Sequence, residues 1–185
     1  GSDGWAYTVR HDGSVVDATR DLYSHAFVLL AVASYVEVTG DRAALSVADD
    51  MLAFCDGRMK SAYGGYVEAL PLRDGPRRQN PHMHLFEGLL SLWRVSGEQR
   101  YLDRARGIFE LFERHFFQPR MGILGEYYDK RLNPAGGDWG HVVEAGHHYE
   151  WIWLLRWFEK ISGRDVQSYV DALYLHAERH GHDRR

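Results

Sequence analysis

The chain has 185 residues and a hydrophobic fraction of 45%, which suits one domain with a substantial core rather than a disordered chain. Its formal net charge is −4, and its arginines and lysines are scattered, so we expect no nucleic-acid partner. Cys55 is the only cysteine, which excludes an internal disulfide and favours a reducing, cytoplasmic setting. The longest uncharged apolar run, Ala26 to Val36, is too short to span a bilayer, so we expect no membrane partner.

Three similar stop signals divide the chain into units. Each combines a small hydroxyl residue, a glycine and a polar residue, and each ends an apolar stretch: Thr39-Gly40-Asp41, Ser96-Gly97-Glu98 and Ser162-Gly163-Arg164. Glycine is the usual left-handed terminator of a helix, so each signal predicts a helix end followed by a second helix. The glycines are separated by 57 and 66 residues, a spacing typical of repeated helical hairpins.

A histidine opens each apolar stretch. His25, His82 and His148 each lie fifteen residues before one of the three glycines. Before each histidine comes a stretch rich in glycine and aromatic residues, which predicts a short strand pair or a long loop. These stretches are Gly4–Gly13, Gly64–Gly75 and Gly125–Asp138. The recurrence of one polar residue at three helix mouths favours a shared pocket.

The two helices of each unit differ in pattern. The first helices are apolar on most sides and should be buried, whereas the second helices, such as Arg100–Phe112 and Val166–His176, are amphipathic and should lie outside. The expected fold is all-α, of the (α/α)6 toroid or barrel type, with about three hairpins forming a partial barrel. Such an arc leaves apolar flanks open at both edges. We therefore expect residues 1–185 to form one α/α domain that is truncated at both ends, or that pairs with a second copy.

The stretch Arg77–Glu87 carries the densest set of reactive side chains. Pro81 suits the first turn of a helix, because its fixed φ is helical and its missing N–H costs nothing there. His84 and Glu87 are three residues apart and share a helix face. A base, a carboxylate and nearby guanidinium groups suit a polar, non-anionic substrate, although a helix cap with a salt bridge is the simpler alternative.

Three motifs resemble those of the N-acylglucosamine 2-epimerase family: Asp21–Phe27, Asn80–Glu87 and Gly146–Trp151. The family includes mannose isomerases and other aldose–ketose isomerases, and the resemblance covers nearly the whole chain. It implies an (α/α)6 barrel that interconverts sugars through an enediol or enediolate, with histidines as acid and base and no cofactor. Family members are about twice as long, which implies that this chain is a central slice without the segment that carries the second catalytic histidine.

The resemblance also assigns residues to a site. It implies that His84 is the general acid/base and Glu87 its neighbouring carboxylate. His25 resembles a substrate-contacting histidine, and by position either His25 or His148 is a candidate second acid/base, so we place His25 with His84 as catalytic. The expected substrate-binding residues are Arg78 (with Arg77 as second choice), Asn80, Glu87, His148, Glu150 and, from its place in a glycine-rich loop, Trp139 for stacking on a sugar.

Other function classes fit less well. A zinc site at His82 and His84 is not expected, because metallohydrolase helices place their histidines four apart so that both face the metal. A toroidal glycosidase or lyase would need a carboxylate pair, which Glu87 and Glu150 would supply. A non-catalytic or incomplete sugar-binding fragment is a third alternative. The favoured function is isomerisation of an unphosphorylated aldose to a ketose, such as mannose to fructose, or C2 epimerisation of an N-acyl hexosamine.

Overall fold

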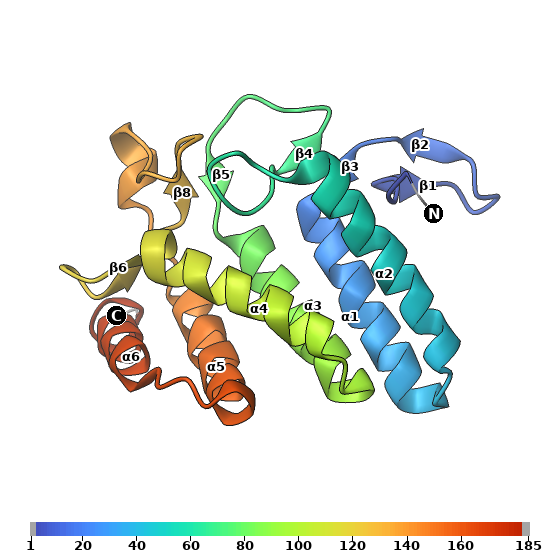
Figure 1. Ribbon diagram of the computed structural model, residues 1–185. Helices are drawn as coiled ribbons and strands as arrows, with labels where there is room; N and C mark the ends of the chain where they lie inside the picture. The colour runs from blue at the N-terminus through green and yellow to red at the C-terminus, as the bar shows by residue number, and fades with distance from the viewer. Residues whose placement is uncertain (1–2, 183–185) are drawn as a thin grey trace.

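Six α-helices follow one another as three antiparallel pairs in residues 3–182, the part of the chain that the computed structural model describes (Figure 1). The ends of the expected domain, residues 1–2 and 183–185, lie outside the described part. The first helices of the pairs are α1 Leu22–Thr39, α3 Asn80–Ser96 and α5 Ala145–Ser162. The second helices are α2 Leu45–Phe54, α4 Gln99–Leu111 and α6 Gln167–His180. The predicted all-α hairpin architecture is confirmed.

The glycine stops are confirmed in detail. Gly40, Gly97 and Gly163 end the three first helices with φ values of 72°, 71° and 72°, and each donates its N–H back to the carbonyl four residues earlier. The side-chain hydroxyl of the residue before each glycine makes two hydrogen bonds. It donates to a carbonyl of the last turn and accepts the N–H of the residue after the glycine. This repeated cap satisfies groups that a helix end otherwise leaves unpaired.

The middle helix is the most enclosed. On α3, ten residues are buried, and the helix packs between α1 and α5 as well as on α4. Its Phe86 ring stacks on Trp151 of α5, which in turn stacks on Phe112 at the end of α4. The first helices therefore form an inner layer, and the second helices cover them from outside (Figure 1). This is the predicted arrangement of an α/α toroid, present here as an open arc.

Large apolar side chains are exposed on the first and last inner helices. Phe27, Tyr35 and Val38 are exposed on α1, and Trp153 is exposed on α5. That the edges of the arc leave apolar flanks uncovered stays a prediction. Pairing with a second copy stays a prediction.

Helix α1 is long and apolar enough, by length and composition alone, to cross a membrane. The expectation of no membrane span rested on the apolar run Ala26 to Val36, but the helix itself is longer, at 18 residues. In this structure α1 buries one side, including Leu22, Leu29 and Ala33, in the common core. The core helix of a soluble protein passes the same length test, and the absence of a membrane partner stays a prediction.

The short strands pair differently from the prediction. Within one loop, β1 Thr8–Val9 pairs with β2 Val15–Asp17, and β6 Phe117–Gln118 pairs with β7 Ile123–Leu124. The other pairs join successive units. β3 Arg20–Asp21 pairs with β4 Ala69–Leu70, and β5 Arg77–Arg78 pairs with β8 Tyr127–Tyr128. The strand before an inner helix is therefore bound to the loop of the next unit, which the sequence pattern did not reveal.

Four short helical turns complete the chain. α2 and α4 each continue into a π-helical turn, η2 Cys55–Met59 and η3 Phe112–Phe116. The turns η1 Arg42–Ala44 and η4 Gly137–His141 are 3₁₀-helical. Cys55 is a free, buried cysteine, and burial raises the pKa of its thiol to about 12, which keeps it protonated and unreactive.

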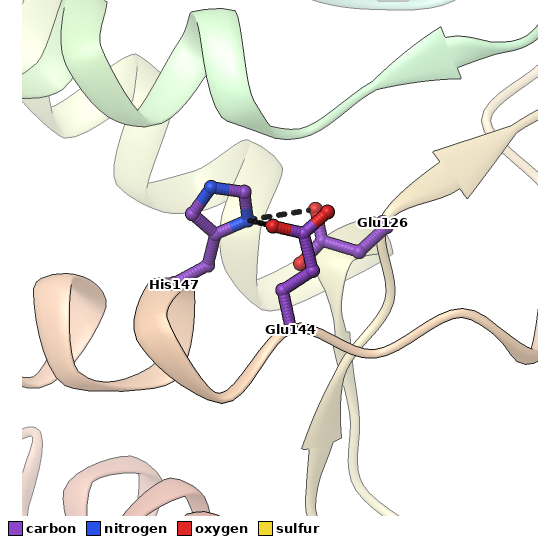
Figure 2. A group of neighbouring side chains, drawn as sticks. All are labelled: Glu126, Glu144 and His147. Atoms are coloured by element: carbon purple, nitrogen blue, oxygen red, sulfur yellow. Dashed lines mark hydrogen bonds and ion pairs between the residues drawn. The ribbon is translucent and has the colours of Figure 1, made fainter. Parts of the chain in front are cut away.

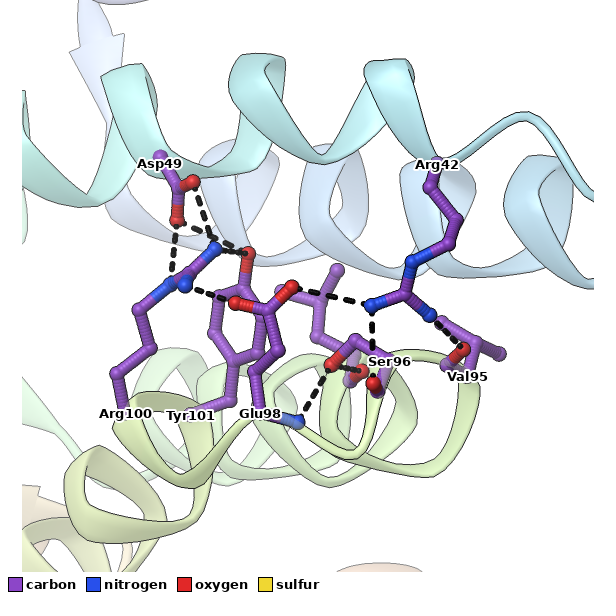
Figure 3. Close-up of polar contacts among 8 residues, drawn as sticks. Arg42, Asp49, Val95, Ser96, Glu98, Arg100 and Tyr101 are labelled. Atoms are coloured by element: carbon purple, nitrogen blue, oxygen red, sulfur yellow. Dashed lines mark hydrogen bonds and ion pairs between the residues drawn. The ribbon is translucent and has the colours of Figure 1, made fainter.

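Polar contacts tie the first hairpin to the second at the end that carries the glycine stops (Figure 3). Arg42 donates to the Ser96 carbonyl at 3.0 Å and to Glu98 at 3.2 Å. Asp49 on α2 accepts from Arg100 at 2.9 Å and from the Tyr101 hydroxyl at 2.9 Å. Exposed ion pairs of this kind contribute only about 0–1 kcal/mol each, so they orient the hairpins more than they stabilise them.

Candidate active site

The inner helices α1, α3 and α5 all begin at the same end of the arc, where the long loops and strands also gather (Figure 1). The predicted site residues lie in or just before the first turns of these helices. The predicted helix start at Pro81 is confirmed, since Pro81 occupies the first turn of α3. The question is which of the side chains at this mouth are open to a substrate.

The three histidines in register share one structural role. Each ring is completely buried, its Nδ1 lies within hydrogen-bonding distance of the carbonyl four residues earlier, and its Nε2 accepts a backbone N–H from the preceding loop. The Nδ1 distances are 2.6 Å for His25 to Asp21 O, 3.3 Å for His82 to Arg78 O and 3.1 Å for His148 to Glu144 O. The Nε2 distances are 3.1 Å to Trp5 N, 3.0 Å to Tyr66 N and 3.2 Å to Leu124 N, in the same order.

These contacts change the roles expected for His25 and His148. Neither ring has a nitrogen left for a substrate, and burial lowers the pKa of both. We therefore do not place His25 in catalysis or His148 in substrate binding. The repetition of the histidine has a packing explanation, because the neutral ring fastens each loop to the helix that follows it. For His82, burial and the nearby Arg77 charge lower the pKa to about 3.

His84 has a different environment. Its Nδ1 lies 3.0 Å from Glu87 Oε2, and its ring contacts Tyr23 and Phe27 of α1 at centroid distances of 5.1 and 4.7 Å. No hydrogen bond occupies its Nε2 among the residues that the structure describes, and 15% of the side chain is exposed. A carboxylate on Nδ1 and an unoccupied Nε2 are the features that a general acid/base histidine needs. The predicted roles of His84 and Glu87 stay predictions that this geometry suits.

His147, which the sequence did not single out, is the other partly exposed histidine in the first turns of the inner helices. Its Nδ1 lies 3.0 Å from Glu126 Oε2 and 3.5 Å from Glu144 Oε2 (Figure 2), and 14% of its side chain is exposed. The Asn80 amide donates to its Nε2 at 2.9 Å. Burial alone would lower the pKa of His147, but the Glu126 hydrogen bond and the charges of Glu126, Glu144 and Glu150 outweigh it and raise the pKa.

A buried amide holds Glu126 in place. Gln79 is fully buried, accepts from the indole N–H of Trp151 at 2.7 Å and donates to Glu126 Oε2 at 3.0 Å. The indole contact fixes which end of the Gln79 amide faces Glu126. Two buried acceptors beside His147, Glu126 Oε1 and Asn80 Oδ1, have no protein donor in the described part of the chain. Unpaired buried acceptors are costly, so this is a place for a water or a ligand hydroxyl.

Asn80 joins the two accessible histidines. Asn80, His84 and Glu87 follow one another at helical spacing, so they share one face of α3. Asn80 contacts His147 across the α3–α5 boundary, so His84 and His147 flank it. Glu150, one turn after His147, is exposed and close enough to raise the pKa of that histidine. The face therefore presents two imidazoles, one amide and carboxylates, a set suited to proton transfer on a polyhydroxy compound.

The remaining predicted residues line a separate hollow. Arg78 and Trp139 border a groove of about 560 Å³ between the loops at the mouth. Arg78 binds Glu68 through its backbone N–H at 2.9 Å and its Nε at 2.8 Å. Trp139 is 53% exposed and rests against the Tyr127 ring at 4.6 Å. No hydrogen bond joins Arg78 or Trp139 to the two accessible histidines among the described residues.

A metal was not expected at this mouth, and the two histidines on which a zinc site would rest diverge. The ring of His82 is buried with both nitrogens engaged, whereas His84 faces α1. Ligand atoms of Glu126, Glu144 and His147 lie within 4.8 Å of one another, close enough to hold an ion. One edge of this cluster is the His147–Glu126 hydrogen bond, so an ion would have to displace a proton from Nδ1. The absence of a metal stays a prediction.

The family model of N-acylglucosamine 2-epimerase (GlcNAc 2-epimerase) matches residues 1–185, the whole chain. The chain belongs to this family. A relative from Rhizobium meliloti strain 1021, named mannose-6-phosphate isomerase, is 40% identical over 169 residues, which cover 89% of this chain and 43% of the relative. The chain thus spans less than half the length of that relative.

Solved structures of similar shape agree with this family and also lie beyond it. The cellobiose 2-epimerase of Spirochaeta thermophila DSM 6192 superposes with a TM-score of 0.82 at 26% identity, covering 95% of this chain and 48% of that one. A family 76 glycoside hydrolase from a bovine Bacteroides thetaiotaomicron strain superposes with a TM-score of 0.72 at 14% identity, covering 95% of this chain and 38% of that one. At that identity the likeness shows only that the α/α toroid is shared with glycosidases.

Sequence reasoning found some of this site and missed the rest. The sequence motifs marked the Asn80–Glu87 face, where His84 lies. At the start of α5 they pointed to His148, which the structure buries, rather than to its neighbour His147. The sequence did contain a signal for Glu126. This carboxylate lies between the apolar pairs Ile123-Leu124 and Tyr127-Tyr128, which suggests that it is buried. A buried carboxylate usually has a partner, and here the partner is His147.

Proposed function

We propose that the protein to which this chain belongs is a sugar isomerase or 2-epimerase that transfers a proton at C2 of a hexose of the mannose type. The observation that carries the proposal is His147, which Glu126 holds at Nδ1 and which contacts Asn80, a residue on the same face of α3 as His84. Family membership supports the reaction class, and the name of the Rhizobium meliloti relative supports an aldose–ketose isomerisation of a mannose derivative. Epimerisation at C2 is the related alternative, which the name of the Spirochaeta thermophila enzyme represents.

The chemistry begins at the open-chain aldose. The proton on C2 is acidified by the neighbouring carbonyl, and removing it forms a C1–C2 double bond with negative charge on O1. His147 is suited to accept this proton, because Glu126 holds Nδ1–H and leaves the lone pair on Nε2. The Asn80 amide, which now donates to that nitrogen at 2.9 Å, is placed to donate to a sugar oxygen instead.

A second group must return the proton. Delivery to C1, with transfer of the O2 proton to O1, gives the ketose, whereas delivery to the opposite face of C2 gives the epimer. His84 fills this place in the proposal, because Glu87 orients its ring and its Nε2 carries no hydrogen bond in the described structure. A further acid/base from the rest of the protein is compatible with this scheme, since the chain covers less than half of its relative.

The alternatives have less support. A glycosidase pair of Glu87 and Glu150 would need one free carboxylic acid and one free carboxylate, but Glu87 is engaged by His84. An incomplete sugar-binding fragment would retain the polar face without turnover. A cytoplasmic location and the absence of nucleic-acid partners stay predictions from the single cysteine and the net charge of −4.

The test is proton exchange in deuterated water with the full-length protein and mannose. We expect deuterium at C2 of recovered mannose together with a ketose or C2-epimer product, both followed by NMR. The reason is that a base which removes the C2 proton exchanges it with solvent before returning it. Sugar binding without C2 exchange or product would contradict an isomerase and favour the binding fragment. Release of reducing ends from an oligomannoside would instead favour the glycosidase.

A further inference from the structure

The loop groove at the mouth differs in charge from the rest of the molecule. The described residues that line it include five cationic side chains and three carboxylates, a local excess of two positive charges on a chain whose net charge is −4. Two of the three lysines in the whole sequence, Lys60 and Lys130, line this groove. Its volume of about 560 Å³ falls within the range of roughly 300–1,000 Å³ that is usual for small-molecule sites.

A buried arginine builds the floor of the groove. Arg77 is only 6% exposed, and its guanidinium donates to the carbonyls of Gly64 at 2.8 Å, Tyr66 at 2.9 Å and Lys130 at 3.5 Å. These bonds fasten together the two loops that carry Lys60 and Lys130. The Nε–H of Arg77 is buried and has no acceptor among the described residues. A charged donor without an acceptor is costly, so Arg77 Nε–H favours an anion or a water at this point.

Two of the three carboxylates of the groove have partners, whereas Asp74 has no hydrogen bond or ion pair within residues 3–182. Glu68 accepts two hydrogen bonds from Arg78, and the Asp21 side chain caps α1 by accepting from Ser24 N at 2.8 Å. Lys60 and Lys130 have no ion pair within residues 3–182. Arg73 at the rim donates to the Thr19 hydroxyl at 3.0 Å and lies close enough to Asp17 for its charge to add to the lowering of that carboxyl's pKa, which hydrogen bonds from Thr19 dominate. The charges of Lys60 and Lys130 are therefore available to a ligand.

Aromatic rings border the same groove. Tyr63, Tyr127 and Trp139 line it, and the exposed Trp139 ring offers a face to a sugar. Aromatic surfaces beside polar groups suit the apolar faces of sugar rings. The groove adjoins α3 in the sequence, because Arg78 of β5 lines it and Asn80, the first residue of α3, follows two residues later.

We propose that this basic groove, formed by Lys60, Arg73, Arg77 and Lys130, binds the phosphate group of a phosphorylated sugar. This rests on the proposed function and sharpens its substrate class, and it replaces the expectation of an unphosphorylated, non-anionic substrate. A phosphate monoester supplies the acceptor that Arg77 Nε–H lacks and neutralises the lysines on either side. The sugar ring then extends from the groove toward the face that carries Asn80.

The test compares ligands on the full-length protein by isothermal titration calorimetry at low and moderate salt. The probes are mannose 6-phosphate, mannose and inorganic phosphate. We expect mannose 6-phosphate to bind about 10-fold or more tightly than mannose at low salt, and the ratio to shrink as salt is added, because exposed charges are screened. The double substitution Lys60→Gln/Lys130→Gln should abolish the preference and leave the affinity for mannose unchanged. Lys160→Gln, which removes the one lysine outside the groove, is the matched control and should keep the preference.

Each arm separates this inference from the proposed function. Equal affinity for the two sugars, or a preference that survives the double substitution, overturns the phosphate site. Inorganic phosphate that binds as tightly as mannose 6-phosphate also overturns it, because the groove would then recognise a free anion rather than a sugar phosphate. C2 exchange without a phosphate preference leaves the isomerase standing and removes the groove. A phosphate preference without C2 exchange on either sugar supports the phosphate site and contradicts the isomerase.

Discussion

Replacing His147 with asparagine lowers the rate of C2 proton exchange by about 10²–10⁴-fold, the usual contribution of a general acid/base. The physical reason is that Glu126 holds the Nδ1 proton and leaves Nε2 as the basic atom beside Asn80. The ring is 14% exposed and pairs with Glu126, which is 3% exposed, so the unfolding temperature should also fall, and exchange is compared per folded molecule. Exchange is measured by NMR in deuterated water on the full-length protein.

The adjacent histidine provides a matched comparison. His148→Asn should keep the chemistry in whatever protein folds, but it removes the acceptor for the buried Leu124 N–H and should lower the free energy of unfolding by about 1–3 kcal/mol. His180→Asn, at an exposed position late in α6, should change neither quantity. Full exchange activity in the His147 variant would remove this residue from the mechanism.

Glu126→Gln tests the positioning role of the carboxylate. Because Glu126 helps to raise the pKa of His147, its removal should shift the pH–rate profile of exchange to lower pH as well as slow the reaction. A purely structural carboxylate would lower stability without moving the profile.

Acid should destabilise the fold through its buried histidines. The pKa of His82 falls from 6.5 in the unfolded chain to about 3 in the folded one, so its stabilising effect is complete above about pH 6.5 and is lost as the pH falls toward 3. From this residue alone, the free energy of unfolding should drop by about 2 kcal/mol between pH 7 and pH 5. His25 and His148, whose pKa values burial also lowers, act in the same direction. His147, with a raised pKa, acts in the opposite direction.

Denaturant unfolding at a series of pH values measures this loss. In His82→Ala the stability at pH 7 should fall by about 3–5 kcal/mol, because a cavity forms and the Tyr66 N–H loses its acceptor. The slope between pH 7 and pH 5 should flatten by the contribution of the lost ring. An unchanged slope would show that another group is responsible for the acid sensitivity.

The hairpin repeat could be predicted because residues close together in the sequence determine where each helix ends. The three glycines adopt the left-handed conformation that only glycine enters without cost, so their positions define where the inner helices end. The layering follows from helix patterns, which are also local. The strand pairs between successive units could not be predicted in this way, since β5 pairs with β8, about fifty residues later in the chain, and each strand has only two residues.

The site was harder to predict because its geometry is not local. Sequence register aligned His25, His82 and His148, but it could not show that a backbone N–H from a distant loop would occupy each Nε2. Likewise, the choice between His147 and His148 depends on which ring turns toward Glu126, some twenty residues earlier and on another element. The basic groove is assembled from three loops, which is why its charge excess was invisible against a net negative chain.

The division of the mouth histidines into structural and reactive groups is the central claim, and NMR of the ¹⁵N-labelled imidazoles tests it most directly. We expect His25, His82 and His148 to carry the proton on Nδ1, to titrate below the usual histidine pKa and to show no shift with added sugar, since both nitrogens of each ring are bonded to backbone. The signals of His84 and His147 should move when the sugar binds, and His147 should titrate above the usual histidine pKa. Titration of His82 near 6.5, or sugar-induced shifts confined to the three buried rings, would contradict the account.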